Sequence, residues 1–177
     1  MLKPYIVEKG IMRIMGKSVS FGGSRPKTSE IGDLFGDRRN ILGSIPNRVD
    51  ERFLGISINF WNNDGEKKRH SYMLGAEVSS LAEYPLDHEC RMIPASRWVY
   101  VPVRYDDPEV KALSPTDKQD DMGFLTGCVF GWAKKWIVES GYIKQDFPEE
   151  LEIYGLYEGY AFPEGDGANI TLGIPII

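Results

Sequence analysis

A single carboxylate, Glu152, is set among apolar and aromatic residues in "PEELEIYG" at 148–155. A strand alternates its faces with a period of two, so Glu152 and Tyr154 would share a face opposite to that of Leu151. A desolvated carboxylate beside an aromatic ring is a good receptor for an organic cation, because Coulomb attraction and cation–π contacts strengthen where water is excluded. Desolvated carboxyl groups also serve as general acids or bases. The pattern therefore suits either binding or catalysis.

Two tryptophans precede this carboxylate on an expected helix. Trp132 and Trp136 are four residues apart, so they lie on one face of that helix, together with Leu125 and Val129. Such a stripe is usually core. The indole N–H of tryptophan nevertheless needs a hydrogen-bond partner when it is buried. Two interpretations therefore stay open: both rings fill a closed core, or at least one of them borders a cavity.

The same helix contains glycine at every fourth position, at Gly123, Gly127 and Gly131. Each glycine costs a helix interior about 1 kcal/mol relative to alanine, so the stripe needs a compensating cause. Close approach of the helix to a sheet is the favoured interpretation, and space left for a ligand is the alternative. Ser114, Pro115 and Asp117 predict the start of this helix, and Gly141 predicts a left-handed stop after it.

The remaining elements repeat one order twice. The first half predicts a strand over 4–21 kinked near Gly10, a helix over 28–42, and strands over 52–61 and 71–81. The second half predicts a strand over 90–105, the long helix, and strands over 150–162 and 169–177. "YMLGAEV" at 72–78 and "ITLGIPI" at 170–176 share Leu-Gly at the same place in their halves. We expect one α+β domain over 1–177, with pseudo-symmetric β-α-β-β halves at about 1–86 and 87–177 and a ligand groove between them.

Composition excludes several classes of function. The net charge of −5 argues against direct nucleic-acid binding, and no apolar run is long enough to span a membrane. With only two cysteines, Cys90 and Cys128, and no leader-like N-terminus, the chain is expected in the cytoplasm without disulfides. "LDHEC" at 86–90 has no second cluster to complete a metal site, and the chain has no phosphate loop, dinucleotide fingerprint or nucleophile elbow. We therefore expect no metal and no cofactor.

The stretch from 132 to 155, "WAKKWIVESGYIKQDFPEELEIYG", resembles the signature of the GyrI-like small-molecule-binding domain, in which a helix ending in Trp and Ser-Gly-Tyr precedes a strand with Glu and Tyr two apart. Strands "SYMLGAEV", "MIPASRWVYV" and "ITLGIPI" fit the same pattern. The resemblance implies tandem β-α-β-β modules with a groove in which Glu152 meets cationic, lipophilic or aromatic compounds. Related domains bind effectors in AraC-type and MerR-type transcription regulators. This chain resembles a stand-alone member.

The resemblance leaves three functions open. The first is small-molecule binding, with a cationic or aromatic ligand; the candidate lining residues are Glu152, Trp136, Tyr154, Trp132, Tyr72, Trp98 and Phe124. The second is hydrolysis of cyclopropanoid alkylating compounds, in which Glu152 would activate water and Glu77 is a candidate second acid through the pseudo-repeat. The third is a protein-interaction role with a regulator or with gyrase. Neither the ligand nor the oligomeric state follows from the sequence.

Overall fold

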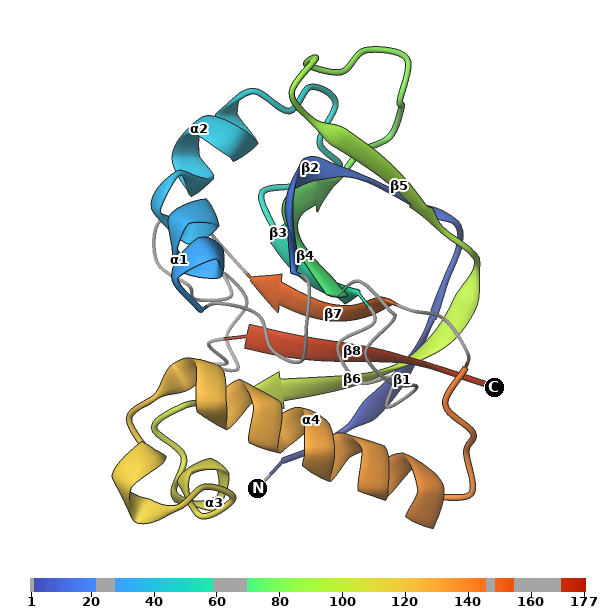
Figure 1. Cartoon of the computed structure of the whole chain (residues 1–177). Helices are drawn as coiled ribbons and strands as arrows, with labels where there is room; N and C mark the ends of the chain where they lie inside the picture. Colours follow the sequence, from blue (N-terminus) through green and yellow to red (C-terminus); the bar gives the residue numbers. More distant parts are fainter. Residues whose placement is uncertain (1, 22–27, 59–69, 146–148, 155–169) are drawn as a thin grey trace.

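The strands of the protein form one curved antiparallel sheet (Figure 1). The computed structural model describes residues 2–21, 28–58, 70–145, 149–154 and 170–177. Its eight strands lie in the order β1-β6-β8-β7-β3-β4-β2-β5. Their bounds are β1 Tyr5–Lys9, β2 Met12–Phe21, β3 Phe53–Ile58, β4 His70–Glu77, β5 Glu89–Ile93, β6 Ser96–Val103, β7 Glu149–Tyr154 and β8 Ile170–Ile176.

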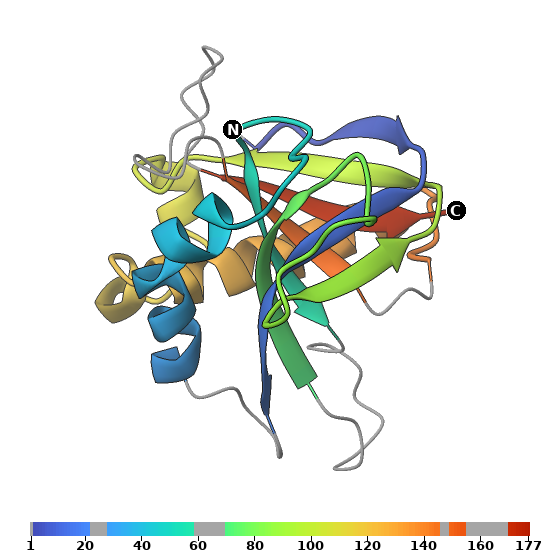
Figure 2. The same ribbon diagram turned by 90° about the horizontal axis from the view of Figure 1, so that it is seen from above.

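The helices lie on one side of this sheet, as the view from above shows (Figure 2). Their bounds are α1 Thr28–Gly36, α2 Arg38–Gly43, α3 Pro108–Lys111 and α4 Met122–Glu139, with a 3₁₀ turn at Thr116–Lys118. One apolar cluster, which includes Leu34, Leu74, Leu172 and Ile137, unites the helices with the sheet. We call the sheet face that contributes to it the helix-side face.

The opposite sheet face has its own apolar cluster. It contains Leu54 and Ile56 of β3, Leu151 of β7, and Trp98 and Tyr100 of β6, and each of these side chains is buried. Alternation along each strand separates the two clusters: Leu54 and Ile56 belong to this one, while Phe53 belongs to the helix-side cluster. Both faces of the central strands are therefore covered, which explains their nearly continuous hydrophobic sequences.

The two halves are related by pseudo-symmetry, as the sequence predicted. The order β3-β4-β2-β5 on one side of the sheet centre is repeated as β7-β8-β6-β1 on the other. The shared Leu-Gly motif falls at equivalent places, because Gly75 pairs with Leu54 in the first half and Gly173 pairs with Leu151 in the second. The prediction of an α+β fold of tandem β-α-β-β modules is thus confirmed.

The edge strands were not predicted. Each of the single strands expected over 4–21 and 90–105 is two strands, interrupted at 10–11 and at 94–95. β1 pairs with β6, whereas β5 pairs with β2, so the edge strand that precedes each half hydrogen-bonds to the other half. The expectation of one kinked strand was wrong because the two strands of each stretch hydrogen-bond to different neighbours. β1 pairs with β6 but β2 pairs with β4, and β5 pairs with β2 but β6 pairs with β8. The division into halves at 86–87 is still a prediction.

The helix boundaries also differ in part from those expected. The helix over 28–42 is two helices that meet at Asp37. The long helix does not begin near Ser114 and Pro115, where the chain is extended before a 3₁₀ turn. It begins after Asp121, whose carboxylate accepts a 3.0 Å hydrogen bond from the Phe124 backbone N–H. An Asp that caps the helix later in the chain overrides the earlier Ser-Pro signal.

The C-terminal stop of α4 is as predicted. Gly141 has φ of +80°, a conformation that glycine adopts without steric cost. The Gly141 N–H donates to the Val138 carbonyl at 3.1 Å, and the Tyr142 N–H donates to the Ile137 carbonyl at 3.0 Å. These two bonds form a Schellman motif, which satisfies the last carbonyl groups of the helix.

The glycine stripe of α4 does not mark close packing at the two positions where its surroundings are described. A Cβ added at Gly131 would meet nothing within 4 Å, and one added at Gly123 would meet only the Asp121 carboxylate at 3.5 Å. The favoured interpretation, close approach to a sheet, was therefore wrong at both. The close approach occurs elsewhere, between Gly16 of β2 and Gly75 of β4.

Candidate functional site

The backbone of Glu152 lies in the centre of the sheet. β7 is one of the two middle strands, and residue 152 pairs with Gly55 of β3 on one side and with Leu172 of β8 on the other. Leu172 packs in the helix-side cluster. The side chains of Glu152 and Tyr154 lie outside the described residues, so the prediction that the two line a ligand groove remains a prediction.

Three aromatic rings of the first half meet on the helix-side face beside this centre. The Phe35 ring of α1 lies 6.4 Å from that of Phe53 and 6.2 Å from that of Tyr72. Phe53 starts the strand that pairs with β7, and its register partner is Tyr154. Tyr72 was a predicted lining residue, whereas Phe35 and Phe53 were not. Their sequence signal was only that of an apolar helix residue and an apolar strand residue.

The predicted aromatic residues of α4 are spread along the helix. Trp132 and Trp136 are partly buried against the helix-side cluster, while Phe124 is 43% exposed at the other end of α4. Trp136 stacks on the Tyr142 ring, with centroids 6.5 Å apart and an interplanar angle of 24°. The Arg97 guanidinium lies 5.5 Å from the centroid of that Tyr142 ring. Trp136 is thus held at the C-terminal end of α4, about 18 Å along the helix from Phe124.

Trp98 is placed on the other side of the sheet from Tyr72. It is fully buried in the cluster opposite to the helices, and its indole nitrogen has no hydrogen-bond partner in the described part of the chain. The structure therefore does not bring Trp98 together with Tyr72, Trp132 and Trp136. Sequence reasoning grouped them by residue type, and strand register separates them.

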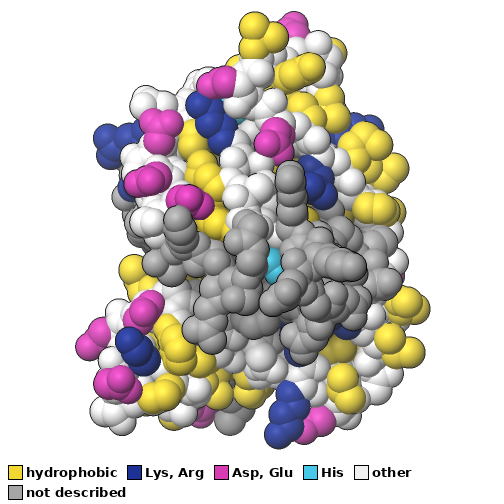
Figure 3. All heavy atoms as spheres, viewed as in Figure 1, with side chains coloured by type: hydrophobic (Ala, Val, Ile, Leu, Met, Phe, Trp, Pro, Cys, Tyr) yellow, Lys and Arg dark blue, Asp and Glu magenta, His cyan; other side chains and the backbone are white. Residues whose placement is uncertain are grey.

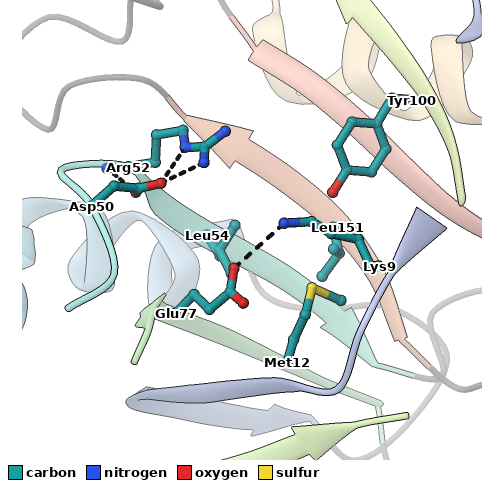
Figure 4. Close-up of a pocket in the computed structure, with 8 residues that line it drawn as sticks. All are labelled: Lys9, Met12, Asp50, Arg52, Leu54, Glu77, Tyr100 and Leu151. Carbon is teal, nitrogen blue, oxygen red and sulfur yellow. Dashed lines mark hydrogen bonds and ion pairs between the residues drawn. The ribbon is translucent and has the colours of Figure 1, made fainter. Parts of the chain in front are cut away.

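A small polar pocket opens on the face without helices (Figure 4). It encloses about 20 Å³, which is room for about one water molecule. We call it the Tyr100 pocket. Its lining consists of Lys9, Met12, Asp50, Arg52, Leu54, Glu77, Tyr100 and Leu151.

The charged residues of the Tyr100 pocket are paired with one another. Lys9 Nζ lies 3.6 Å from Glu77 Oε2, and Arg52 Nε donates to Asp50 Oδ2 at 2.7 Å (Figure 4). Burial, reinforced by the negative charge of Glu77, raises the pKa of the Tyr100 hydroxyl. These two pairs balance the positive and negative charges of the side chains that line the pocket. Glu77, which the sequence suggested as a second acid beside Glu152, lies in this pocket.

His88 of the "LDHEC" stretch is engaged in the packing of the first half. Its Nδ1 lies 3.0 Å from Asp87 Oδ1, and its Nε2 lies 3.1 Å from the Ser44 hydroxyl and 3.3 Å from the Ile41 carbonyl oxygen. The side chain is 1% exposed. His88 thus ties the segment before β5 to the end of α2.

Comparison with solved structures identifies the fold. A protein from Staphylococcus aureus MU50, described as a candidate bacterial transcription regulation protein, superposes with a TM-score of 0.61 at 11% identity, over 98% of this chain and 97% of that one. SAV2435, solved with bound tetraphenylphosphonium, gives 0.65 at 11% identity over 99% and 94%. The C-terminal domain of EcmrR gives 0.60 at 14% identity over 100% and 98%.

The chain shares the fold of these proteins. The result agrees with the GyrI-like fold that the sequence resemblance implied. No protein-family model and no curated protein matches the chain in sequence, so membership of that family is still a prediction. Among the described helices, none is long and apolar enough to cross a membrane.

Proposed function

We propose that the protein binds small organic cations or aromatic compounds at the centre of the helix-side face, with Glu152 as the charged group of the site. The observation that carries the proposal is the position of residue 152 in the middle of the sheet, where the two halves meet. SAV2435, which has the same fold, was solved with tetraphenylphosphonium, a lipophilic cation. That likeness supports the ligand class and does not name the ligand.

The register around residue 152 suits such a site. Its neighbour in β3 is Gly55, which has no side chain, so this central pair carries one side chain and it is a carboxylate. The rings of Phe35, Phe53 and Tyr72 lie together on the helix-side face, where Phe53 and Tyr72 are buried. We propose that they form the apolar floor beneath a planar or bulky cation. Trp132 and Trp136 of α4 are proposed to contribute from the second half.

Binding has more support than hydrolysis. Hydrolysis of an electrophilic substrate would benefit from a second acid near Glu152, and Glu77 was the candidate. Glu77 lies instead in the Tyr100 pocket, on the face without helices, where it pairs with Lys9. Glu77 thus does not supply a second carboxylate on the face of the sheet where the site is proposed.

Calorimetric titration with tetraphenylphosphonium tests the proposal. We expect wild type to bind it, Glu152→Gln to bind about tenfold more weakly, and the neutral analogue triphenylphosphine oxide to show no such dependence on residue 152. Glu83→Gln removes an equal charge from an exposed loop and serves as the matched control. Equal affinity of wild type and Glu152→Gln for the cation would refute the role of Glu152.

A further inference from the structure

A serine, a histidine and an aspartate are joined in series by hydrogen bonds at the end of α2. Ser44 Oγ lies 3.1 Å from His88 Nε2, and His88 Nδ1 lies 3.0 Å from Asp87 Oδ1. The order hydroxyl, imidazole, carboxylate is that of a catalytic triad, in which the ring takes the proton of the hydroxyl while the carboxylate holds the ring in place. We call these three residues the Ser44 triad.

The two sides of the Ser44 triad are positioned by separate backbone hydrogen bonds. Ser44 follows α2, and its N–H donates to the Asn40 carbonyl oxygen at 3.2 Å. Asp87 and His88 belong to a turn that the His88 N–H closes by donating to the Pro85 carbonyl oxygen at 3.0 Å. The end of a helix and a tight turn therefore bring the hydroxyl and the ring together.

The carboxylate determines which nitrogen of the His88 ring carries a proton. Hydrogen bonding to Lys17, and then to His88, lowers the pKa of the Asp87 carboxyl to about 2, so this group is ionised at neutral pH and can only accept hydrogen bonds. The bond between the two therefore needs a proton on His88 Nδ1. Nε2 of a neutral ring is then left with a lone pair directed at Ser44 Oγ. Lys17 Nζ lies 2.6 Å from Asp87 Oδ2 and so holds the carboxylate in this orientation.

The burial of the Ser44 triad suits a nucleophile with a base behind it. Ser44 is exposed, whereas the His88 side chain is only 1% exposed. A substrate can therefore reach the hydroxyl, while water has little access to the ring. The Ser44 hydroxyl also donates to the Ile41 carbonyl oxygen at 2.8 Å. Its proton thus has two acceptors, and of these only the ring is basic enough to remove it.

A concave surface of about 320 Å³ adjoins the Ser44 triad and is large enough for a small substrate. Lys17, which pairs with Asp87, and Ile41, whose carbonyl group contacts Ser44, both line this surface. Its other lining residues are apolar or acidic: Val19, Leu34, Glu30, Asp33 and Asp37. Figure 3 shows acidic side chains beside hydrophobic ones over α1 and α2. Such a surface favours an uncharged or cationic substrate with an apolar part over an anion.

We propose that Ser44 is a nucleophile that takes acyl groups from activated esters, with His88 as its general base and Asp87 as the residue that positions the ring. Ser44 Oγ forms a bond to the ester carbonyl carbon, and the bond from that carbon to the leaving alcohol oxygen breaks. The hydroxyl proton passes to His88 Nε2 and then to the leaving oxygen, so the products are an acyl-serine and an alcohol.

The expected reaction is acylation with slow turnover. The Ser44 N–H is used at the end of α2, so it does not stabilise the negative oxygen that forms on the substrate. Glu152 takes no part in this step. The proposal therefore does not depend on the small-molecule function proposed above, and either can fail without the other.

Labelling with a fluorophosphonate probe tests the nucleophile, because an activated serine hydroxyl attacks the phosphorus atom and displaces fluoride. We expect mass spectrometry of the full chain to find the label on Ser44, at a rate about a hundredfold above that at Ser140. Ser140 is the matched control. It is exposed and follows α4 as Ser44 follows α2, and within the described residues no hydrogen bond joins it to a histidine. Ser44→Ala should lose the label, and His88→Gln should label residue 44 about as slowly as Ser140.

The ¹⁵N shifts of the His88 ring test the role of Asp87. At about pH 8 the wild-type ring should carry its proton on Nδ1. In Asp87→Asn the amide can donate to Nδ1, so the proton should move to Nε2 and labelling of Ser44 should slow by more than about tenfold. Lys17→Met keeps the bond between Asp87 and His88, and its labelling rate should be close to that of wild type. Urea denaturation checks that each variant is folded.

Three outcomes would overturn the proposal. Labelling of Ser44 no faster than that of Ser140 would leave His88 with a structural role alone. Labelling of folded His88→Gln at the wild-type rate would exclude the ring as the base. A wild-type ring with its proton on Nε2 would donate to Ser44 and could not accept the serine proton. The first and third measurements use the wild-type chain, so they do not depend on the folding of a variant.

Discussion

Gly55 and Glu152 are register partners on the pseudo-two-fold axis of the sheet. Leu54 corresponds to Leu151, because each pairs with the glycine of a Leu-Gly motif. Leu54 pairs with Ile153, and Leu151 pairs with Ile56. An exchange of the two halves therefore maps the Gly55–Glu152 pair onto itself. The halves differ at this pair, where one contributes a glycine and the other a carboxylate. A single charge at a symmetric centre suits a ligand that meets both halves.

The close approach of β2 to β4 gives the first prediction. A Cβ at residue 16 would lie 2.1 Å from the Leu74 carbonyl oxygen, and one at residue 75 would lie 2.2 Å from the Met15 carbonyl oxygen. Backbone atoms of paired strands cannot move aside without breaking strand hydrogen bonds. Gly16→Ala should therefore destabilise the fold by about 3 kcal/mol. Urea denaturation measures this change.

The matched control for Gly16→Ala is Gly10→Ala. Gly10 lies between β1 and β2, and a Cβ there would meet nothing within 4 Å. The free energy of unfolding of Gly10→Ala should stay within about 0.5 kcal/mol of that of wild type. If the two variants unfold at the same urea concentration, the close backbone contact is not present in solution.

Gly131 and Gly141 of α4 should respond to alanine in opposite directions. Gly141 has a positive φ, so Gly141→Ala should lose about 1 kcal/mol of stability. Gly131 is inside the helix with open space around it, so Gly131→Ala should gain about 1 kcal/mol. Thermal unfolding of the two variants checks the signs. A loss at both positions would mean that Gly131 has a packing role.

Local signals predicted the fold better than they predicted the strand partners. The Leu-Gly motifs and the turn residues between apolar runs are local, and they correctly predicted two similar halves. The exchange of β1 and β5 depends on which sheet edge each strand reaches, and strand partners distant in sequence leave no local trace. The start of α4 was missed because Ser114 and Asp121 are both good caps by residue type.

The candidate site was predicted unevenly for a related reason. Glu152 was chosen from the tandem layout and the stretch from Trp136 to Tyr142 before it, together with alternation along its strand, and its backbone lies in the centre of the sheet. The face of one strand relative to another requires register, so Trp98 was grouped with Tyr72 although the two lie in opposite clusters. Phe35 and Phe53 were missed because their ring contacts join a helix to a strand.

The ion pair between Lys17 and Asp87 predicts an acid titration. Hydrogen bonding to Lys17, and then to His88, lowers the pKa of the Asp87 carboxyl from its ordinary value of 3.8 to about 2. The stabilisation from this pair is therefore present above about pH 4 and is lost as the pH falls through about 2. The carboxyl ¹³C shift of Asp87, followed by NMR between those pH values, reports the midpoint.

Substitution of the lysine identifies the cause of that shift. In Lys17→Met the midpoint of Asp87 should move up toward 3.8 while staying somewhat below it, because the contact with His88 remains. Lys9→Met removes a lysine that pairs with Glu77 instead, and it should leave the midpoint unchanged. An Asp87 midpoint near 2 in Lys17→Met would show that the ion pair does not cause the shift.

The sequence pattern and the structure assign the capping of α4 to different residues, Asp117 and Asp121. The Asp121 carboxylate accepts the Phe124 N–H at 3.0 Å, so Asp121→Ala should cost about 1 kcal/mol. Asp117, which the sequence pattern placed in a capping box, lies exposed in the 3₁₀ turn, and Asp117→Ala should change stability by less than about 0.5 kcal/mol. Urea denaturation of both variants ranks them. The reverse order would place the beginning of the helix at the Ser114–Pro115 signal after all, and α4 would then be longer in solution than Met122–Glu139.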